Sequence, residues 1–134
     1  AGTMWNHGPM MWKEMEKSGI SPPKFSGEEM ADLIAYLYFL NYVEPAGRAD
    51  RGQKIFSEKG CSKCHSEVKD QKSIGPPLSN SNASSTPVNL ITAMWNHTID
   101  MKKYMVRDKI NWPKFSDTEM EDLYLYLKSL RESD

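Results

Sequence analysis

The sequence is poor in cysteine: only two of its 134 residues are Cys, at positions 61 and 64. It also lacks a long apolar run, because the longest unbroken one, residues 33–40, is too short to span a bilayer. Neither sign of charge is in excess, with a formal net charge of −1, so nucleic acid and charged membrane surfaces are not expected partners. The length fits one domain, or one domain with an additional segment, and allows a buried core.

Both cysteines lie in one short motif, Cys61-Ser62-Lys63-Cys64-His65, which has the C-x-x-C-H pattern of c-type haem attachment. Two thiols at this spacing reach the two vinyl groups on one edge of a porphyrin, and His65 then supplies the proximal nitrogen to the iron. A zinc site is one alternative, but it needs a second ligand pair, and the chain has only two other His. A redox-active Cys-x-x-Cys is another, but it gives the His no role. The motif therefore predicts one covalently bound haem c and leaves no cysteine for a disulfide.

Three further segments accompany the motif. Gly52-Gln53-Lys54-Ile55-Phe56 stands upstream, Ile74-Gly75-Pro76-Pro77-Leu78 stands downstream, and Phe115 precedes a terminal helix that contains Tyr126. Together they resemble a class I cytochrome c over roughly residues 46–130. The resemblance implies an all-α fold in which the Pro76 carbonyl holds His65 and Leu78 packs on the haem. We expect the haem pocket to contain Phe56, Pro76, Leu78, Trp95, Trp112 and Phe115.

The resemblance also implies a function and a location. Haem of this type is attached outside the bacterial cytoplasm, so we expect an exported, periplasmic protein whose Ala1-Gly2 is a processed start. Size, a single haem and a duplicated half are similar to the two-lobed periplasmic monohaem cytochromes of metal-reducing, electrode-active bacteria. The expected role is one-electron transfer, without enzymatic activity, between transient redox protein partners. A haem-based gas sensor or a small peroxidase with a labile distal ligand is the alternative.

An internal repeat occupies both ends of the chain. Residues 1–40 align with residues 91–130 at an offset of 90 without a gap, and 19 of the 40 aligned positions are identical. The first copy contains no Cys, so it cannot attach a haem covalently. We therefore expect a haemless N-terminal helical lobe and linker over residues 1–44, and a cytochrome c haem domain over residues 45–134. We expect the lobe to dock on the haem domain of the same chain, as a monomer, with a domain-swapped dimer as the rival.

Each copy predicts two helices. The first helix is expected over about residues 5–18 and 90–108, and the second begins with a capping box, Ser26 with Glu29 and Ser116 with Glu119. A helical apolar stripe follows in each copy, and only the second stripe has an expected partner, the helix around Gly52. Residues 41–50 are expected to form a linker, and residues 79–89 a polar loop. The stripes are Met30, Leu33, Leu37 and Leu40, and Met120, Leu123, Leu127 and Leu130.

The sixth iron ligand is the open point of the sequence. Many class I cytochromes supply it from a Met-Pro-x-Phe segment, but this chain has Trp112 at the Met position, and Trp cannot ligate iron. Met101 is the expected ligand, with Met105 and then His97 as alternatives. Met11 and Met15 occupy the matching positions of the haemless copy, where they act as apolar side chains or line the other side of the one haem.

Charge is unevenly distributed along the chain. Residues 1–50 carry four basic and seven acidic residues, whereas residues 51–72 carry six basic and three acidic residues. The segment that attaches haem is therefore basic. It forms either a solvated face or a docking patch for an acidic partner.

Overall fold

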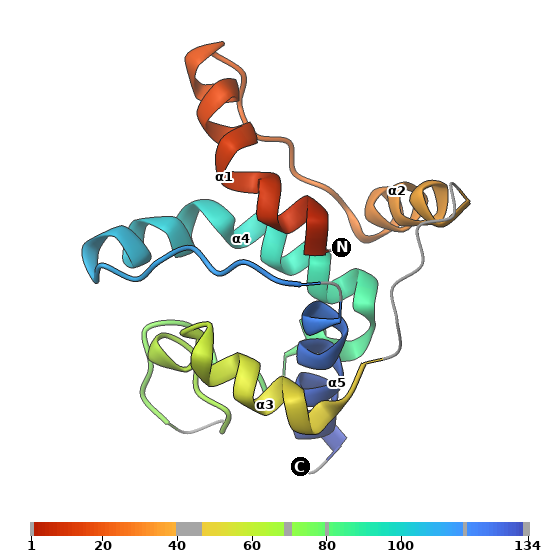
Figure 1. The fold of residues 1–134 in the computed structure, drawn as a ribbon, viewed down its shortest axis with the longest axis vertical. Coiled ribbons are helices and arrows are strands. Elements are labelled where there is room, and N and C mark those ends of the chain that lie inside the picture. Colours follow the sequence, from red (N-terminus) through yellow and green to blue (C-terminus); the bar gives the residue numbers. More distant parts are fainter. Residues whose placement is uncertain (1, 40–46, 69–70, 80, 117, 133–134) are drawn as a thin grey trace.

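A computed structural model of the protein describes residues 2–39, 47–68, 71–79, 81–116 and 118–132. These ranges contain no strand and form five α-helices, so the expected all-α fold is confirmed (Figure 1). The α-helices are α1 (Gly2–Lys17), α2 (Gly27–Phe39), α3 (Ala49–Glu58), α4 (Pro87–Arg107) and α5 (Glu119–Glu132), and two short 3-10 helices are η1 (Cys61–Lys63) and η2 (Asn82–Ser85). None of the helices within the described ranges has the length and hydropathy of a membrane span.

Ser26 and Glu29 form the predicted capping box at the start of α2, whereas Ser116 and Glu119 form one of its two bonds before α5. The Ser26 N–H donates to the Glu29 carboxylate at 2.8 Å, and the Glu29 N–H donates to Ser26 Oγ at 3.2 Å. In the second copy the Ser116 N–H donates to the Glu119 carboxylate at 2.7 Å. These bonds satisfy backbone donors that a helix start would otherwise leave unpaired.

Helix α4 begins earlier than the sequence analysis expected. The Thr86 side chain accepts from the Asn89 N–H at 3.1 Å, and Pro87 occupies the first helical turn, where its missing N–H costs nothing. The expected polar loop over residues 79–89 was therefore too long by about one helical turn, and it also contains η2. Of the expected linker, residues 41–46 lie outside the described residues, as does the boundary proposed between residues 44 and 45.

Helix α3 crosses α5 at a glycine. A Cβ atom on Gly52 would lie 2.0 Å from the Asp122 carbonyl oxygen, so only glycine permits this approach. The rings of Phe56 and Tyr126 pack 5.8 Å apart beside the crossing. Asp122 accepts from the Arg48 N–H at the start of α3, and its carboxylate lies 3.0 Å from the Arg51 guanidinium. Helix α5 thus packs on the helix around Gly52, as the sequence predicted, and the contacts at the crossing fall on Asp122 and Tyr126, beside its apolar stripe.

The two repeats exchange tryptophan hydrogen bonds. Trp5 on α1 donates its indole N–H to the Pro113 carbonyl of the second copy at 3.1 Å. Trp95 on α4 donates in the same way to the Pro23 carbonyl of the first copy at 3.0 Å. Each helix therefore bonds to the segment that precedes the other copy's second helix. Figure 1 shows that segment of the second copy running past α1.

The neighbouring asparagines repeat the exchange. Asn6 bonds to both backbone polar groups of Phe115, accepting from its N–H at 2.7 Å and donating to its carbonyl. Asn96 does the same to Phe25, at 3.0 Å and 2.8 Å. The two copies therefore interlock within one chain.

An aromatic cluster fills the space between the two copies. Trp112 stacks on Trp5 with ring centres 4.7 Å apart and meets the edge of Trp12 at 5.3 Å. Trp12 in turn lies 5.6 Å from Trp95 on α4. Buried aromatic surface of this size is a large share of the stabilisation between the copies.

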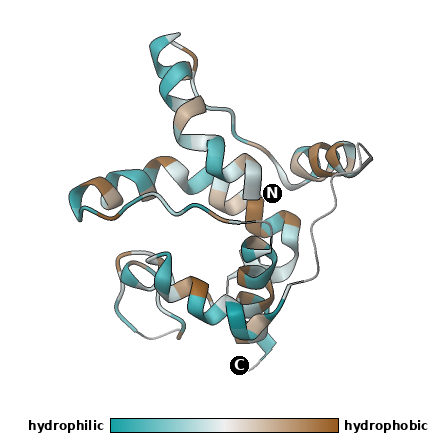
Figure 2. Cartoon of the chain, in the orientation of Figure 1, coloured by the Kyte–Doolittle hydropathy of each residue, from teal (hydrophilic) through white to brown (hydrophobic). Residues whose placement is uncertain are grey.

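Helix α2 is buried on one side only. Met30 is fully buried, and α2 packs on α4 of the same chain. Leu33 and Leu37 are half-buried, whereas Leu40 lies outside the described residues. Figure 2 shows hydrophobic residues along α2. The half-buried Leu33 and Leu37 show that its apolar stripe is only partly covered.

Candidate functional site

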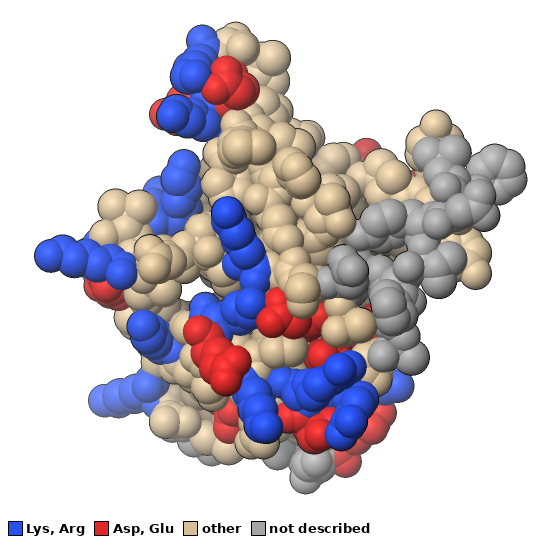
Figure 3. All heavy atoms as spheres, viewed as in Figure 1, with Lys and Arg blue, Asp and Glu red and all other residues tan. Residues whose placement is uncertain are grey.

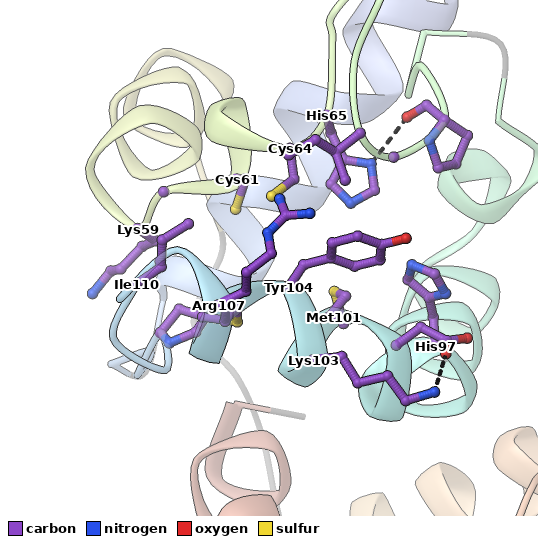
Figure 4. Close-up of a pocket in the computed structure, with 17 residues that line it drawn as sticks. Lys59, Cys61, Cys64, His65, His97, Met101, Lys103, Tyr104, Arg107 and Ile110 are labelled. Carbon is purple, nitrogen blue, oxygen red and sulfur yellow. Dashed lines mark hydrogen bonds and ion pairs between the residues drawn. The ribbon is translucent and has the colours of Figure 1, made fainter.

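The Cys-x-x-Cys-His motif forms one tight turn after α3. Gly60 has a φ of +81°, a left-handed conformation that ends α3 and starts η1. The His65 N–H donates to the Cys61 carbonyl at 2.9 Å and closes the turn. The turn places Cys61, Cys64 and His65 on one wall of a cavity (Figure 4).

The backbone of the following loop orients the His65 ring. His65 Nδ1 lies 2.9 Å from the Pro76 carbonyl oxygen, which can only accept, so Nδ1 carries the proton and Nε2 keeps its lone pair. Gly75 supports the same ring, because a Cβ atom there would lie 2.6 Å from His65 Cε1. The Gly75 N–H donates to the Cys64 carbonyl at 2.7 Å and fixes the loop against the turn.

Burial also sets the protonation states of His65 and Cys61. It lowers the pKa of His65, although the bond to the Pro76 carbonyl acts in the opposite direction and the nearby His97 adds to the lowering. His65 is therefore neutral at pH 7, as a metal ligand must be. Burial raises the pKa of the Cys61 thiol to about 11, so this thiol is protonated.

The cavity opposite His65 has a volume of about 580 Å³, within the range of about 300–1,000 Å³ that is usual for ligand pockets. One face of α4 forms its far wall, with His97, Met101, Tyr104 and Met105. These positions follow the helical period of three or four residues. The ring centres of His65 and His97 are 6.4 Å apart across the cavity.

Three cations line the cavity, each with a partner. Lys59 lies 2.9 Å from the Glu119 carboxylate, and Lys103 lies 3.2 Å from Asp100. Arg107 pairs with its neighbour Asp108 at 2.6 Å and lies 5.0 Å from the centre of the Tyr104 ring. Figure 3 shows basic side chains along this side of the molecule, with acidic ones among them.

Five of the expected pocket residues do not line this cavity within the described part of the chain. Leu78 packs at the edge of the core, and the other four belong to the aromatic packing around α1, α4 and α5. Trp112 Nε1 is buried without a partner among the described residues. Their contact with haem stays a prediction. The five are Phe56, Leu78, Trp95, Trp112 and Phe115, whereas the sixth, Pro76, lines the cavity.

Several residues of the cavity walls were not predicted from the sequence. Tyr104 follows His97 and Met101 at helical spacing, so the period of α4 was a signal that could have identified it. Gly75 stands inside the Gly-Pro-Pro-Leu segment, so the resemblance of that segment was the signal that could have identified it. Arg107 and Ile110 gave no signal, because helix length and loop path decide their position.

The residues present fit a covalently attached haem. One wall offers two thiols and the free Nε2 of a neutral imidazole, and the opposite wall offers two thioethers. Among the described residues there is no group of three or more His, Cys, Asp or Glu side chains that would hold a metal ion by itself. These donors therefore suit a haem iron.

The comparisons with known proteins agree with this geometry. The family model described as Cytochrome c matches residues 49–131. No match was found among curated proteins or among solved structures. The matched range contains α3, the Cys-x-x-Cys-His turn and both walls of the cavity. Members of the family bind haem c through this motif and transfer electrons, and the chain belongs to the cytochrome c family.

Proposed function

We propose that the protein is a periplasmic, monohaem c-type cytochrome that carries single electrons between protein partners and is not an enzyme. The observation that supports this most is the His65 wall. A neutral imidazole, held by the Pro76 carbonyl beside two thiols, faces an apolar cavity with thioethers on its other side. The chain has one such motif, which favours a single haem.

Each wall has a defined task in this proposal. The bound haem supplies an iron that takes up and releases one electron. Cys61 and Cys64 hold the group covalently, and Pro76 orients His65 through a second-sphere bond that also makes its Nε2 a stronger donor. The apolar and charged side chains on the walls set the polarity around the group, which tunes the reduction potential.

Met101 is the proposed sixth ligand. It lies on α4 in the wall opposite His65 and is half-buried. Met105 is the alternative, one helical turn further along the same wall. His97 is a rival on geometry, because two imidazoles on one metal, with metal–nitrogen bonds of about 2 Å each, need roughly 6 Å between ring centres, close to the observed 6.4 Å.

The partner is proposed to be a redox protein with an acidic docking surface. The haem-attachment segment is basic in sequence, and Lys59, Lys103 and Arg107 line the cavity. Encounters of this kind are short-lived and steered by charge. The association rate with such a partner should therefore fall as ionic strength rises.

The visible spectrum of Met101→Ala tests the ligand assignment. Met11→Ala is the matched control, because Met11 occupies the same position in the copy without a Cys-x-x-Cys-His motif. We expect Met101→Ala to convert a low-spin ferric spectrum to a high-spin or hydroxide-bound one, and Met11→Ala to leave the spectrum unchanged. Loss of low-spin ligation in Met105→Ala or His97→Ala alone would transfer the assignment to that residue.

Intact mass and the wild-type spectrum test the function itself. We expect the mass of one covalently attached haem, and we expect Cys61→Ser or Cys64→Ser to prevent normal maturation and so to lower the yield of haem-bearing protein. A high-spin wild-type spectrum that changes on adding carbon monoxide or peroxide would contradict the carrier proposal and favour the gas sensor or small peroxidase.

A further inference from the structure

The first repeat keeps a helix face that the second repeat buries. Asp32 and Tyr36 on α2 align with Asp122 and Tyr126 on α5, with identical residue types. Tyr126 is 6% exposed, whereas Tyr36 is 61% exposed. Asp122 is fully buried, whereas Asp32 is exposed and has no hydrogen-bond or ion-pair partner in the described part of the chain.

Helix α5 shows what such a face accepts. It receives α3, whose Gly52 allows the backbones to touch and whose Phe56 packs on Tyr126. The carboxylate of Asp122 receives the first turn of α3 through the Arg48 N–H and the Arg51 guanidinium. The complementary helix is therefore one with an Arg-Gly-x-x-x-Phe pattern.

The far wall of the cavity, formed by α4, is also repeated in the first copy, on α1 and the segment after it. Met11, Met15 and Ile20 occupy the positions that Met101, Met105 and Ile110 occupy in the second copy, where all three line the cavity. Met11 is 38% exposed and Ile20 is 55% exposed. The first copy thus presents both surfaces that the second copy uses to enclose its haem-attachment half.

We infer that α2, together with the exposed face of α1, is a docking site for the haem-bearing half of another cytochrome c module. This haem-bearing half must begin with a helix like α3 and must lack a helix like α5 that would cover it. A second folded copy of this chain does not meet this condition, because its Gly52 face is already covered by its own α5. Figure 1 shows α2 and α3 as separate, with α3 lying on α5.

Titration calorimetry of the full-length protein tests this inference. The probe is a haem-bearing peptide of residues 47–79, which has the required helix and no closing helix. We expect saturable binding with one peptide per protein, weakened at least tenfold by Tyr36→Ala. Tyr38→Ala is the matched control, since Tyr38 lies on the same helix at 66% exposure but aligns with Lys128, and we expect a change within twofold. Equal effects of the two substitutions would overturn the inference.

A second pair of variants tests the role of the Asp32 charge in binding. A fusion protein tests the same contact when the free peptide binds too weakly to measure. Asp32→Asn should weaken binding several-fold, and Glu28→Gln should not. If the free peptide does not bind, a fusion that carries residues 47–79 ahead of Ala1 provides the test. In this fusion the α2 amides should be protected from hydrogen exchange, and Tyr36→Ala should remove that protection. Unprotected amides in that fusion would overturn the inference, as would dimerisation of the protein alone that Tyr36→Ala abolishes.

Discussion

The two repeats of this chain share 19 of their 40 aligned residues but differ in what covers the shared positions. Tyr126 and Asp122 are buried under α3, whereas their twins Tyr36 and Asp32 face solvent. The difference lies outside the repeat, in the one helix that only the second copy has as a neighbour. Sequence identity within a repeat therefore sets which helices form, and the neighbouring segment decides which of their faces become core.

The largest contrast is expected between the two tyrosines. Tyr126→Ala removes a buried ring from the α3–α5 crossing and should cost about 3–5 kcal/mol of unfolding free energy. Tyr36→Ala removes an exposed ring and should change it by about 0.5 kcal/mol or less. Denaturant titration followed by far-ultraviolet circular dichroism measures both. Similar losses for the two variants would mean that α2 is covered in solution.

The aspartates sharpen the same comparison at a smaller scale. Asp122→Asn weakens charge-assisted bonds to the Arg48 N–H and the Arg51 guanidinium, and should cost about 1.5–3 kcal/mol. Asp32→Asn, without a partner in the described residues, should be close to neutral. A loss from Asp32→Asn as large as that from Asp122→Asn would contradict the proposed role of α3 as the cause.

Alkaline pH should lower the stability of the folded protein through the buried ring of Tyr126. Burial, and then the hydrogen bond to Glu67 at 2.5 Å with the charge of that carboxylate, raises the pKa of Tyr126 above its ordinary value. Above about pH 10 the unfolded chain releases this proton while the folded chain keeps it, so stability should fall with rising pH, by up to about 1.4 kcal/mol per unit. Unfolding titrations between pH 9 and 11, roughly one unit either side of the ordinary Tyr pKa, should show a shallower slope for Tyr126→Phe. Tyr36→Phe is the control, and its slope should match that of the wild type.

The smallest contrast concerns the interlocking asparagines. Asn6 and Asn96 make the same two backbone bonds, but those of Asn6 are partly buried and those of Asn96 are exposed. We expect Asn6→Ala to cost about 1–3 kcal/mol, because Phe115 is left with unpaired backbone groups, and Asn96→Ala about 0.5–1.5 kcal/mol. Thermal unfolding of the two variants in parallel would reveal the difference, and a reversed order would show that burial does not control these bonds.

Much of this architecture was predictable because local rules govern it. The capping box at Ser26 and Glu29 and the helical stripe of α5 are set by residues a few positions apart. The Cys-x-x-Cys-His turn and the Pro76 bond to His65 were predictable because both lie in segments that resemble a class I cytochrome c.

Other features depend on how the two copies are arranged in space, which the spacing of residues along the sequence does not determine. The offset of 90 shows that two segments are alike, but Trp5 has an equivalent carbonyl in both copies, at Pro23 and Pro113. Only the arrangement in space selects the second. Trp95 and Trp112 were expected among the haem contacts, and the sequence did not show that both also pack into the cluster between the copies. Their contact with haem stays a prediction.

The exchange between the repeats has a consequence for synthesis of the protein. The bond from Trp5 to Pro113 joins residues 108 positions apart, so it forms only after residue 113 has been made. Contacts of such long range slow folding and leave apolar surface uncovered in the meantime. During translation or export, the tryptophans of α1 therefore stay exposed until that bond can form. The haem-attachment turn is made earlier and can already react with haem. Closure of the N-terminal copy would then be the last event in maturation.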